Sequence, residues 1–257
     1  MERLKIIPSK YFSQYNKSQP ITLIKHFNKI KTSSFDYGYA VTESAVASSQ
    51  IEGNILDIDT YVKFNTTGMN TNTKPFREIK YLEAAYKFAK THVLNAKNIL
   101  HAHFLLSDPD VFEEKYRGKY RDLNVFVGQG KMVLYVATAH DIVFLEMDKF
   151  ISDILLLRKR QLTIQQTFYF ASLIHLVFVK IHPFADGNGR VGRLLEKWFL
   201  AEKLGDKAWF INSEKLYSKR RKSYCLNISD LGKNYIGLDY DYCIPFLKML
   251  PMALRVK

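Results

Sequence analysis

The sequence predicts an all-α fold, a helical bundle that carries one small β-hairpin. Apolar side chains recur every three or four residues through most of the 257 residues, and this is the period of a helix that buries at least one face. The stretch from Gly118 to Val136 instead has a strand pattern around a glycine-rich turn. We expect a helical N-terminal region over residues 1–70 and a compact core over residues 71–257.

The N-terminal region is polar and basic up to residue 36, and a short helix is expected around Ile21 to Ile30. From about Tyr37, a helix rich in Ala, Val and Ser runs to Glu52, and Gly53 ends it. Glu52 would lie in the last helical turn, where the helix dipole disfavours an anion. The position therefore indicates that a cation lies near Glu52.

The first part of the core is predicted as two helices followed by the hairpin. One helix starts at Phe76, after a Thr/Asn/Gly loop, and the next covers residues 99–106. His101 and His103 do not share a helix face, which argues against a zinc pair and favours capped or core histidines. The hairpin is expected to have strands at residues 124–127 and 132–136, and one open edge.

Two helices then frame a polar loop. Thr163 and Gln166 have the form of a capping box, and apolar residues keep the helical spacing as far as Phe178. His175 in this helix is predicted to be buried and hydrogen-bonded. A second helix is expected to end at Gly205. The loop and the following turn, residues 182–193, read His-Pro-Phe-Ala-Asp-Gly-Asn-Gly-Arg-Val-Gly-Arg. Such residues would make a poor core, so we interpret the segment as a site.

The residue types in this segment suit a phosphate chain. The backbone N–H groups of Asn188, Gly189 and Arg190 are expected at a helix N-terminus, where free donors and the helix dipole attract phosphate. Glycines at 187 and 189 leave room for a bound anion. Arg190 and Arg193, three residues apart, lie on one helix face and can grip a polyphosphate through bidentate hydrogen bonds.

His182 and Asp186 add the chemistry. One carboxylate, phosphate oxygens and water are the usual ligands of Mg²⁺ in proteins, and a neutral imidazole can take a proton from an attacking hydroxyl. These residues predict nucleotide-dependent group transfer. Gly187-x-Gly189-x-x-Gly192 also matches the dinucleotide-binding fingerprint, but residues 182–186 separate it from the apolar run and the chain lacks alternating strands and helices. We therefore reject that interpretation.

Composition constrains the partners. Lys and Arg number 38 against 25 Asp and Glu, a formal charge of +13. For the basic run at residues 219–222, we favour a solvated helix face over a nucleic-acid patch. Cys225 and Cys243 cannot form a disulfide scaffold. The N-terminus lacks a signal h-region and we expect no apolar run of membrane-spanning length, so the sequence predicts a cytoplasmic protein.

The segment His182-Pro-Phe-x-Asp-Gly-Asn-Gly-Arg-x-x-Arg193 resembles the signature of the Fic family, whose members typically transfer AMP from ATP to a hydroxyl side chain of a target protein. The resemblance covers roughly residues 37–250. It implies that His182 is the general base, Phe184 a buried anchor and Asp186 the Mg²⁺ ligand. It also implies an anion hole formed by Asn188 with the amides of Gly187 and Gly189, and outer phosphates bound by Arg190 and Arg193.

Three further segments are similar to functional parts of that family. Ser48-x-x-x-Glu52-Gly53 resembles an inhibitory motif in which the glutamate pairs with the second arginine of the signature, here Arg193. Ser48 is either a hydrogen-bonding residue of the site or a helix-surface residue. The hairpin corresponds to a flap along which a target would add as a strand; its residues are Val125, Phe126, Val127, Met132 and Val133. Tyr224 and Asn227 match an adenine-binding segment, with a core tyrosine as the alternative.

The resemblance therefore implies a Fic fold and a Mg²⁺-dependent, autoinhibited protein adenylyltransferase with ATP as substrate. Two alternatives stay open within the same fold, namely another nucleotide donor or removal of AMP with Glu52 positioning water. A nucleic-acid-binding or toxin–antitoxin interaction protein with a vestigial site is the alternative from another class. The expected partner is a target protein at the hairpin edge, and self-modification and homodimer formation stay open.

Overall fold

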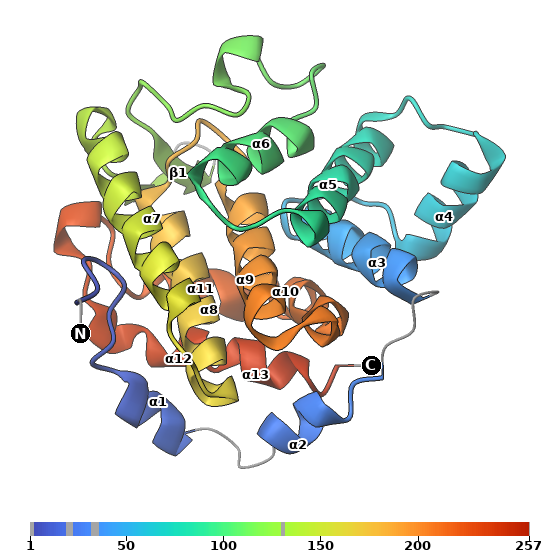
Figure 1. The fold of residues 1–257 in the computed structure, drawn as a ribbon. Coiled ribbons are helices and arrows are strands. Elements are labelled where there is room, and N and C mark those ends of the chain that lie inside the picture. Colours follow the sequence, from blue (N-terminus) through green and yellow to red (C-terminus); the bar gives the residue numbers. More distant parts are fainter. Residues whose placement is uncertain (1–2, 19–22, 32–35, 130–131, 257) are drawn as a thin grey trace.

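The computed structural model describes residues 3–18, 23–31, 36–129 and 132–256. It confirms the all-α fold with a two-stranded hairpin (Figure 1). The helices, in order, are α1 Phe12–Ser18, α2 Leu23–Asn28, α3 Asp36–Ile51, α4 Ile58–Thr67, α5 Lys74–Thr91, α6 Ala96–Leu106, α7 Val143–Lys159, α8 Ile164–Ile181, α9 Asn188–Leu204, α10 Ser213–Lys219, α11 Arg221–Ser229, α12 Ile244–Leu247 and α13 Met249–Ala253. The strands are β1 Phe126–Gln129 and β2 Met132–Val136.

Helix α8 is the centre of the core and packs along α9 (Figure 1). The predicted capping box begins it: the Thr163 hydroxyl accepts from the Gln166 N–H at 3.2 Å, and the Gln166 side chain accepts from the Thr163 N–H at 2.9 Å. Within the part of the chain that the structure describes, α8 is the one helix that by length and composition could cross a membrane, which corrects the expectation that no apolar run is long enough. However, 78% of that window is buried inside the protein, as is usual for a core helix.

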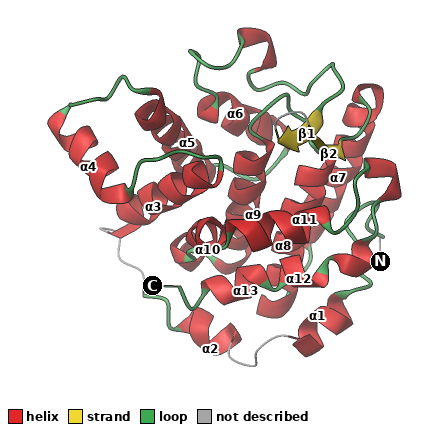
Figure 2. Ribbon diagram, turned by 180° about the vertical axis from the view of Figure 1, so that it is seen from behind, coloured by secondary structure: helices red, strands yellow, loops and turns green. Residues whose placement is uncertain are grey.

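The other helices surround this central pair. Helix α3 packs against α5 and α10 and also reaches α9, while α1 and α2 pack on α8. Figure 2 shows α10 to α13 together on the opposite side from the view of Figure 1. Helix α3 comes from the predicted N-terminal region, and its contact with α9 brings that region to the site. The division at residue 70 stays a prediction.

Several elements differ from the expectations. Helix α4 was not predicted; Asp57 caps it by accepting from the Thr60 N–H at 2.7 Å. After α9, the helices α10 and α11 meet at Arg220. The short helices α12 and α13 close the chain's fold. Gly205 follows α9 with a φ of 79° but a ψ of −171°, so it does not adopt the predicted αL conformation.

The hairpin is antiparallel, with Phe126 opposite Val136 and a shift of register between Val127 and Gly128. It is joined to the core through β2, because the Tyr135 hydroxyl donates to the Lys180 carbonyl at the end of α8 (2.6 Å). Its predicted turn includes Gly130, which lies outside the described residues. The hairpin therefore stands beside the loop that joins α8 to α9.

Candidate functional site

The loop between α8 and α9 is held from inside. Phe184 is fully buried and its ring stacks on the His103 ring, with centroids 3.7 Å apart and planes 5° apart, so it is the anchor that the sequence predicted. The Asn188 side chain bridges the loop, since its amide oxygen accepts from the Phe184 N–H (2.9 Å) and its amide nitrogen donates to the Phe184 carbonyl (2.8 Å). Asn188 can therefore contribute only its backbone N–H to an anion site.

His182 ends α8 in the left-handed conformation, with φ and ψ both 57°. Its Nδ1 lies 3.2 Å from the Val179 carbonyl. A carbonyl can only accept, so this contact places the proton on Nδ1 and leaves Nε2 as an acceptor. Burial lowers the pKa of His182 to about 4. At neutral pH the imidazole is uncharged and has a free basic nitrogen.

The N-terminus of α9 has backbone N–H groups without partners inside the helix. Gly187 adopts a φ of 82° before the helix, and no side chain caps the helix. A Cβ atom on Gly187 would lie 3.3 Å from Nε2 of His103, so glycine is needed there for both conformation and space. The Val191 N–H is the first to bond within the helix, to the Gly187 carbonyl. The N–H groups of Asn188, Gly189 and Arg190 are thus available to a ligand. The Gly187 N–H differs from the expectation, because it donates to Asp186 Oδ1.

Arg193 is the central cation of the site and is 1% exposed. Its Nε donates to the Ser48 hydroxyl (2.8 Å), and its Nη2 donates to the Ser48 carbonyl (3.0 Å) and to Glu52 Oε1 (2.7 Å). Its Nη1 donates to the Tyr224 hydroxyl at 3.3 Å. Burial lowers the pKa of Arg193, but Tyr224 and Glu52 raise it by more, so the net shift is upward.

The Glu52 carboxylate lies directly over Gly189. A Cβ atom on Gly189 would be 2.7 Å from Glu52 Oε1 and 3.1 Å from Arg193 Nη1. Helix α3 ends at Ile51, so Glu52 lies one residue beyond the helix and not in its last turn as predicted, and Gly53 follows with a φ of 102°. The predicted cation near Glu52 is Arg193. The carboxylate thus occupies the place beside the α9 N-terminus where an anion would bind.

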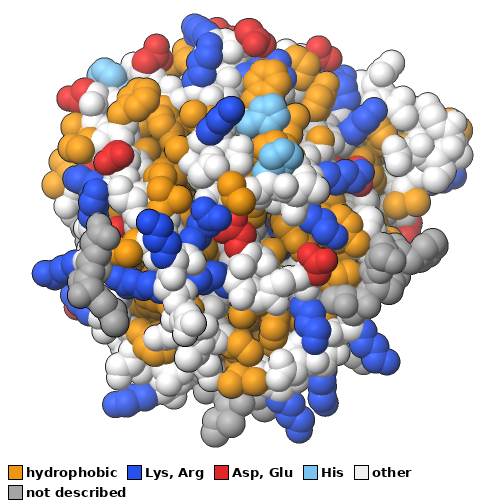
Figure 3. Space-filling model, viewed as in Figure 1, with side chains coloured by type: hydrophobic (Ala, Val, Ile, Leu, Met, Phe, Trp, Pro, Cys, Tyr) orange, Lys and Arg blue, Asp and Glu red, His pale blue; other side chains and the backbone are white. Residues whose placement is uncertain are grey.

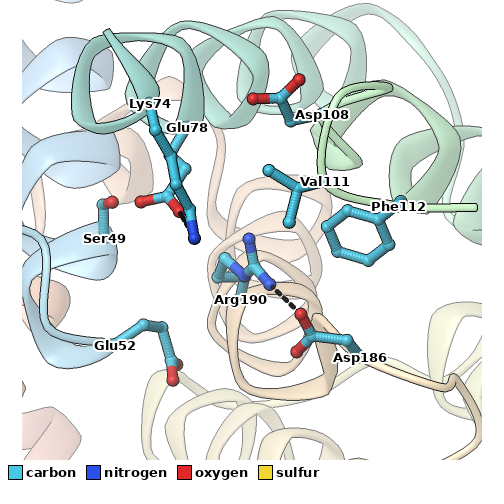
Figure 4. Close-up of a pocket in the computed structure, with 9 residues that line it drawn as sticks. All are labelled: Ser49, Glu52, Lys74, Glu78, Asp108, Val111, Phe112, Asp186 and Arg190. Atoms are coloured by element: carbon cyan, nitrogen blue, oxygen red, sulfur yellow. Dashed lines mark hydrogen bonds and ion pairs between the residues drawn. The ribbon is translucent and has the colours of Figure 1, made fainter.

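Arg190 and Asp186 lie on the other side of Glu52. They form an ion pair of 3.1 Å across a cavity of about 200 Å³ (Figure 4), and the Asp186 side chain is 66% exposed. Nε of Arg190 is buried and, among the described residues, has no partner. No group of three or more His, Cys, Asp or Glu side chains suited to a metal occurs in residues 3–18, 23–31, 36–129 and 132–256. Asp186 is a single exposed carboxylate at this cavity.

A second cavity, of about 280 Å³, opens beside His182 and Arg193. Its wall is largely apolar beyond these two residues; the other contributors are Ile51, Glu52, Val127, Leu134, Tyr135, Val179, Lys180, Gly189, Arg221, Tyr224, Cys225, Ile228 and Ser229. Glu52 lines both cavities. Its carboxylate therefore separates the space around Arg190 from the space around His182.

The two adenine-binding candidates differ from the resemblance. Tyr224 reaches the second cavity but is buried, and its hydroxyl is hydrogen-bonded to Arg193 and, at 3.0 Å, to Nε2 of His175. Its main role is thus the one expected of a core tyrosine. Asn227 does not line either cavity; its amide nitrogen lies 3.4 Å from the sulfur of Met249. His175 is fully buried between Tyr224 and Glu196, as predicted.

The hairpin lies at the rim of the second cavity. Val127 points into the cavity wall, whereas Phe126 and Val133 are exposed by 58% and 56%. Val125 precedes β1 and its carbonyl accepts from the Ala137 N–H, and Met132 is the first residue of β2. The hairpin thus presents apolar side chains next to the base.

Sequence reasoning missed Arg121, which is buried at the base of the hairpin. Its guanidinium donates to the carbonyls of His182 (2.8 Å), Leu123 (2.7 Å) and Thr138 (2.5 Å). Leu123 and Thr138 flank the hairpin on its two sides, so Arg121 ties both ends of the hairpin to the residue that carries the base. A single arginine in a basic loop has no pattern that would distinguish it in the sequence.

Residues 93–200 match the Fic/DOC family. Among solved structures, the chain is similar to a Fic family protein from Desulfovibrio desulfuricans G20, with a TM-score of 0.73 and 22% identity over 99% of this chain and 74% of that one. It is also similar to a Fic domain containing signaling protein from Bacteroides thetaiotaomicron, with a TM-score of 0.67 and 18% identity over 96% of this chain and 93% of that one. A third similar structure is Fic-1 from C. elegans, with a TM-score of 0.60 and 19% identity over 95% of this chain and 66% of that one. At these identities the likeness shows the fold. No curated protein sequence matches the chain.

Proposed function

We propose, from the match of residues 93–200 to the Fic/DOC family, that the chain is an autoinhibited protein adenylyltransferase, which moves AMP from ATP to a Ser, Thr or Tyr hydroxyl of a target protein. The observation that carries the proposal is the position of Glu52. Its carboxylate lies over Gly189 and on Arg193, where a phosphate would meet the helix N-terminus and an arginine. A carboxylate of the chain in this position would compete with a bound phosphate for the same donors, which is how an autoinhibitory group acts.

His182 supplies the base in this reaction. Nε2 takes the proton of the target hydroxyl while the hydroxyl oxygen forms a bond to the α-phosphorus of ATP. The bond between the α-phosphorus and the oxygen that bridges to the β-phosphorus breaks, and pyrophosphate leaves with that electron pair. A neutral imidazole with its other nitrogen fixed on Val179 suits this task, since general base catalysis needs an unprotonated, oriented acceptor.

The phosphate chain is held by groups of the α9 N-terminus. The N–H groups of Gly189 and Arg190 and the guanidinium groups of Arg190 and Arg193 would stabilise the charge that develops on the leaving pyrophosphate. Asp186 and phosphate oxygens would hold Mg²⁺, which when bound neutralises part of the phosphate charge. Asp186 has the exposure for this role, provided that Arg190 exchanges it for a phosphate.

The state in which Glu52 pairs with Arg193 would be inactive. A γ-phosphate cannot share Arg193 with the carboxylate, and two anions at that distance repel each other. If the closed state were favoured a hundredfold, the apparent affinity for productively bound ATP would fall by about the same factor. The lock is local, because one side chain bonds to Arg193 and also lines both cavities.

The target would lie along the hairpin, close to His182. The exposed apolar residues Phe126 and Val133 and the backbone of the strands favour an extended segment that adds as a strand. Main-chain pairing places a hydroxyl without selecting much sequence, so the hairpin would fix geometry and not target choice.

Removal of AMP from a modified protein is a second candidate, and one observation favours it. The Glu52 carboxylate faces the same cavity as His182 and could orient a water molecule for attack on the phosphodiester. The two activities respond in opposite directions to loss of Glu52, because transfer is released whereas removal loses its water-positioning group.

The test is label transfer from α-labelled ATP with Mg²⁺, to the protein itself and to a lysate. We expect strong labelling by Glu52→Gly, little by the wild type, and none by Glu52→Gly combined with His182→Ala. Glu78→Ala is the matched control, since Glu78 also lines the Arg190 cavity but bonds to Asn54 and Lys74 and should leave labelling at the wild-type level. Equal labelling by wild type and Glu52→Gly would contradict the lock, and faster loss of AMP in the wild type would favour removal.

A further inference from the structure

The contact between α3 and α9 is built from two matched pairs. Ser44 and Ser48 lie one turn apart on α3, and Lys197 and Arg193 lie one turn apart on α9. The Lys197 ammonium donates to the Ser44 hydroxyl at 2.6 Å, and Arg193 Nε donates to the Ser48 hydroxyl at 2.8 Å. All four side chains are buried. The helix that carries Glu52 is therefore fixed to the helix that carries the anion site along two successive turns.

Lys197, which bonds to Ser44 of α3, is itself held in place by other helices. Lys197 also forms a buried ion pair with Glu214 of α10 at 2.6 Å, and Glu214 accepts from the Tyr86 hydroxyl of α5 at 2.7 Å. Undocking of α3 would break the bonds from Lys197 to Ser44 and from Arg193 to Ser48, and would leave two buried cations short of partners. Relief of inhibition by movement of the whole helix is thus disfavoured.

Glu52 is placed differently from Ser48. It follows the end of α3, next to Gly53, and its side chain is 46% exposed. It can leave Arg193 by rotation of its own side chain, while Ser48 stays within the helix. The inhibitory contact and the serine contact are thus separable, although both involve one arginine.

The hydrogen-bond capacity of Arg193 indicates what happens next. A guanidinium has five N–H donors, and the contacts in the described residues use four of them: two on Ser48, one on Tyr224 and one on Glu52. When Glu52 leaves, one N–H on Nη1 and one on Nη2 are free. Two such donors at the end of a guanidinium form the fork that matches two oxygens of a phosphate.

We propose that Ser48 is a positioning residue of the nucleotide site and not only part of the inhibitory segment. It holds Nε and one N–H of Nη2, so that the remaining fork of Arg193 faces the outer phosphates of a nucleoside triphosphate beside Gly189. Helix α3 then lines the active site in both the inhibited and the active state. This inference rests on the proposed nucleotide-binding function and adds a residue that supports binding once the lock is open.

The experiment compares Glu52→Gly with the double variant that adds Ser48→Ala, and with a matched control that adds Ser44→Ala. Binding of ATP and of AMP is measured by calorimetry, together with KM and kcat for label transfer. We expect Ser48→Ala to weaken ATP binding and raise KM about tenfold, the effect of one hydrogen bond to a charged group. AMP binding should change less than twofold, because AMP has no outer phosphates.

The Ser44→Ala control removes a hydroxyl from the same helix and a similar buried cation, one turn further from the phosphates. It should leave the affinities for both nucleotides within twofold of Glu52→Gly. Equal ATP affinity with and without Ser48 would overturn the proposal, as would an equal loss for ATP and AMP, which would indicate general disruption. If Glu52→Gly binds ATP but transfers no label, the proposed function is contradicted. The role of Ser48 is still tested in that case, because calorimetry measures ATP binding independently of label transfer.

Discussion

At the scale of single residues, protonation of His182 matters most. The imidazole is held by Val179 through Nδ1 and surrounded by protein, and burial lowers its pKa to about 4. A histidine whose pKa lies below its ordinary value is neutral at every pH above that lowered pKa. The base is therefore in its active form throughout the physiological range.

This predicts a direct titration result. At pH 5.5 a histidine of ordinary pKa is about 90% protonated, whereas His182 should remain neutral. Imidazole NMR of the labelled protein between pH 7.5 and 5 measures this, with the His182→Ala protein to assign the signal. A midpoint between 6 and 7 would contradict the proposed environment.

The site residues could be predicted from the sequence to the extent that their roles are local. The glycines, Phe184 and the two arginines act through spacing along one loop and one helix, which a sequence displays. The roles of Asn188, Tyr224 and Asn227 depend on which neighbours their side chains reach. Asn188 bonds to Phe184 and Tyr224 to Arg193 and His175, and a linear pattern does not contain those partners.

At the scale of elements, the hairpin depends on one buried side chain. A lone two-stranded hairpin is marginally stable, and here Arg121 bonds to carbonyls on both of its flanks and to the His182 carbonyl. The hairpin and the end of α8 are thus joined through one guanidinium. This link correlates the position of the strands proposed to bind the target with the position of His182.

Arg121→Ala should therefore affect both stability and transfer. Three hydrogen bonds to a charged group are lost, so we expect the free energy of unfolding to fall by about 3 kcal/mol or more. In the Glu52→Gly background, target labelling should fall more than ATP binding does. Urea unfolding and the labelling assay measure these effects. The control is Lys119→Ala, an exposed change expected to stay within about 0.5 kcal/mol.

Elements with strong periodicity were predicted well, and α8 with its capping box is the clearest case. Helix α4 was missed because its Thr and Asn residues have weak helix propensity, and Asp57 and packing decide its structure. The break between α10 and α11 at Arg220 has no signal in the sequence, because the basic run continues across it without a proline or glycine.

At the scale of the whole molecule, a charge of +13 does not create an evident nucleic-acid surface on the face that Figure 3 shows. Lys and Arg side chains are scattered there, with Asp and Glu between them. Buried polar contacts join the helices instead: Arg193 of α9 donates to Ser48 of α3, and Lys197 of α9 pairs with Glu214 of α10. Under the proposed function, stability and nucleotide binding are coupled through Arg193.

That coupling predicts how the protein responds to ATP. Glu52→Gly leaves a buried cation without its carboxylate, and because Glu52 is half-exposed we expect a loss of about 1.5 kcal/mol in the free energy of unfolding. MgATP at a hundred times its Kd should restore about 2.7 kcal/mol in this variant and much less in the wild type. Urea unfolding with and without MgATP measures both. An equal gain in the two proteins would contradict competition between Glu52 and phosphate.

The backbone of His182 has a further consequence, in evolutionary terms. With φ and ψ at 57°, the residue occupies a conformation that favours glycine or asparagine over most other residues. Histidine in this conformation costs free energy of folding. A descendant of this chain that no longer needed the base could avoid this cost by a substitution. Divergent copies that have lost the activity are thus expected to carry glycine or asparagine at this position, so one codon would report whether selection still maintains the chemistry.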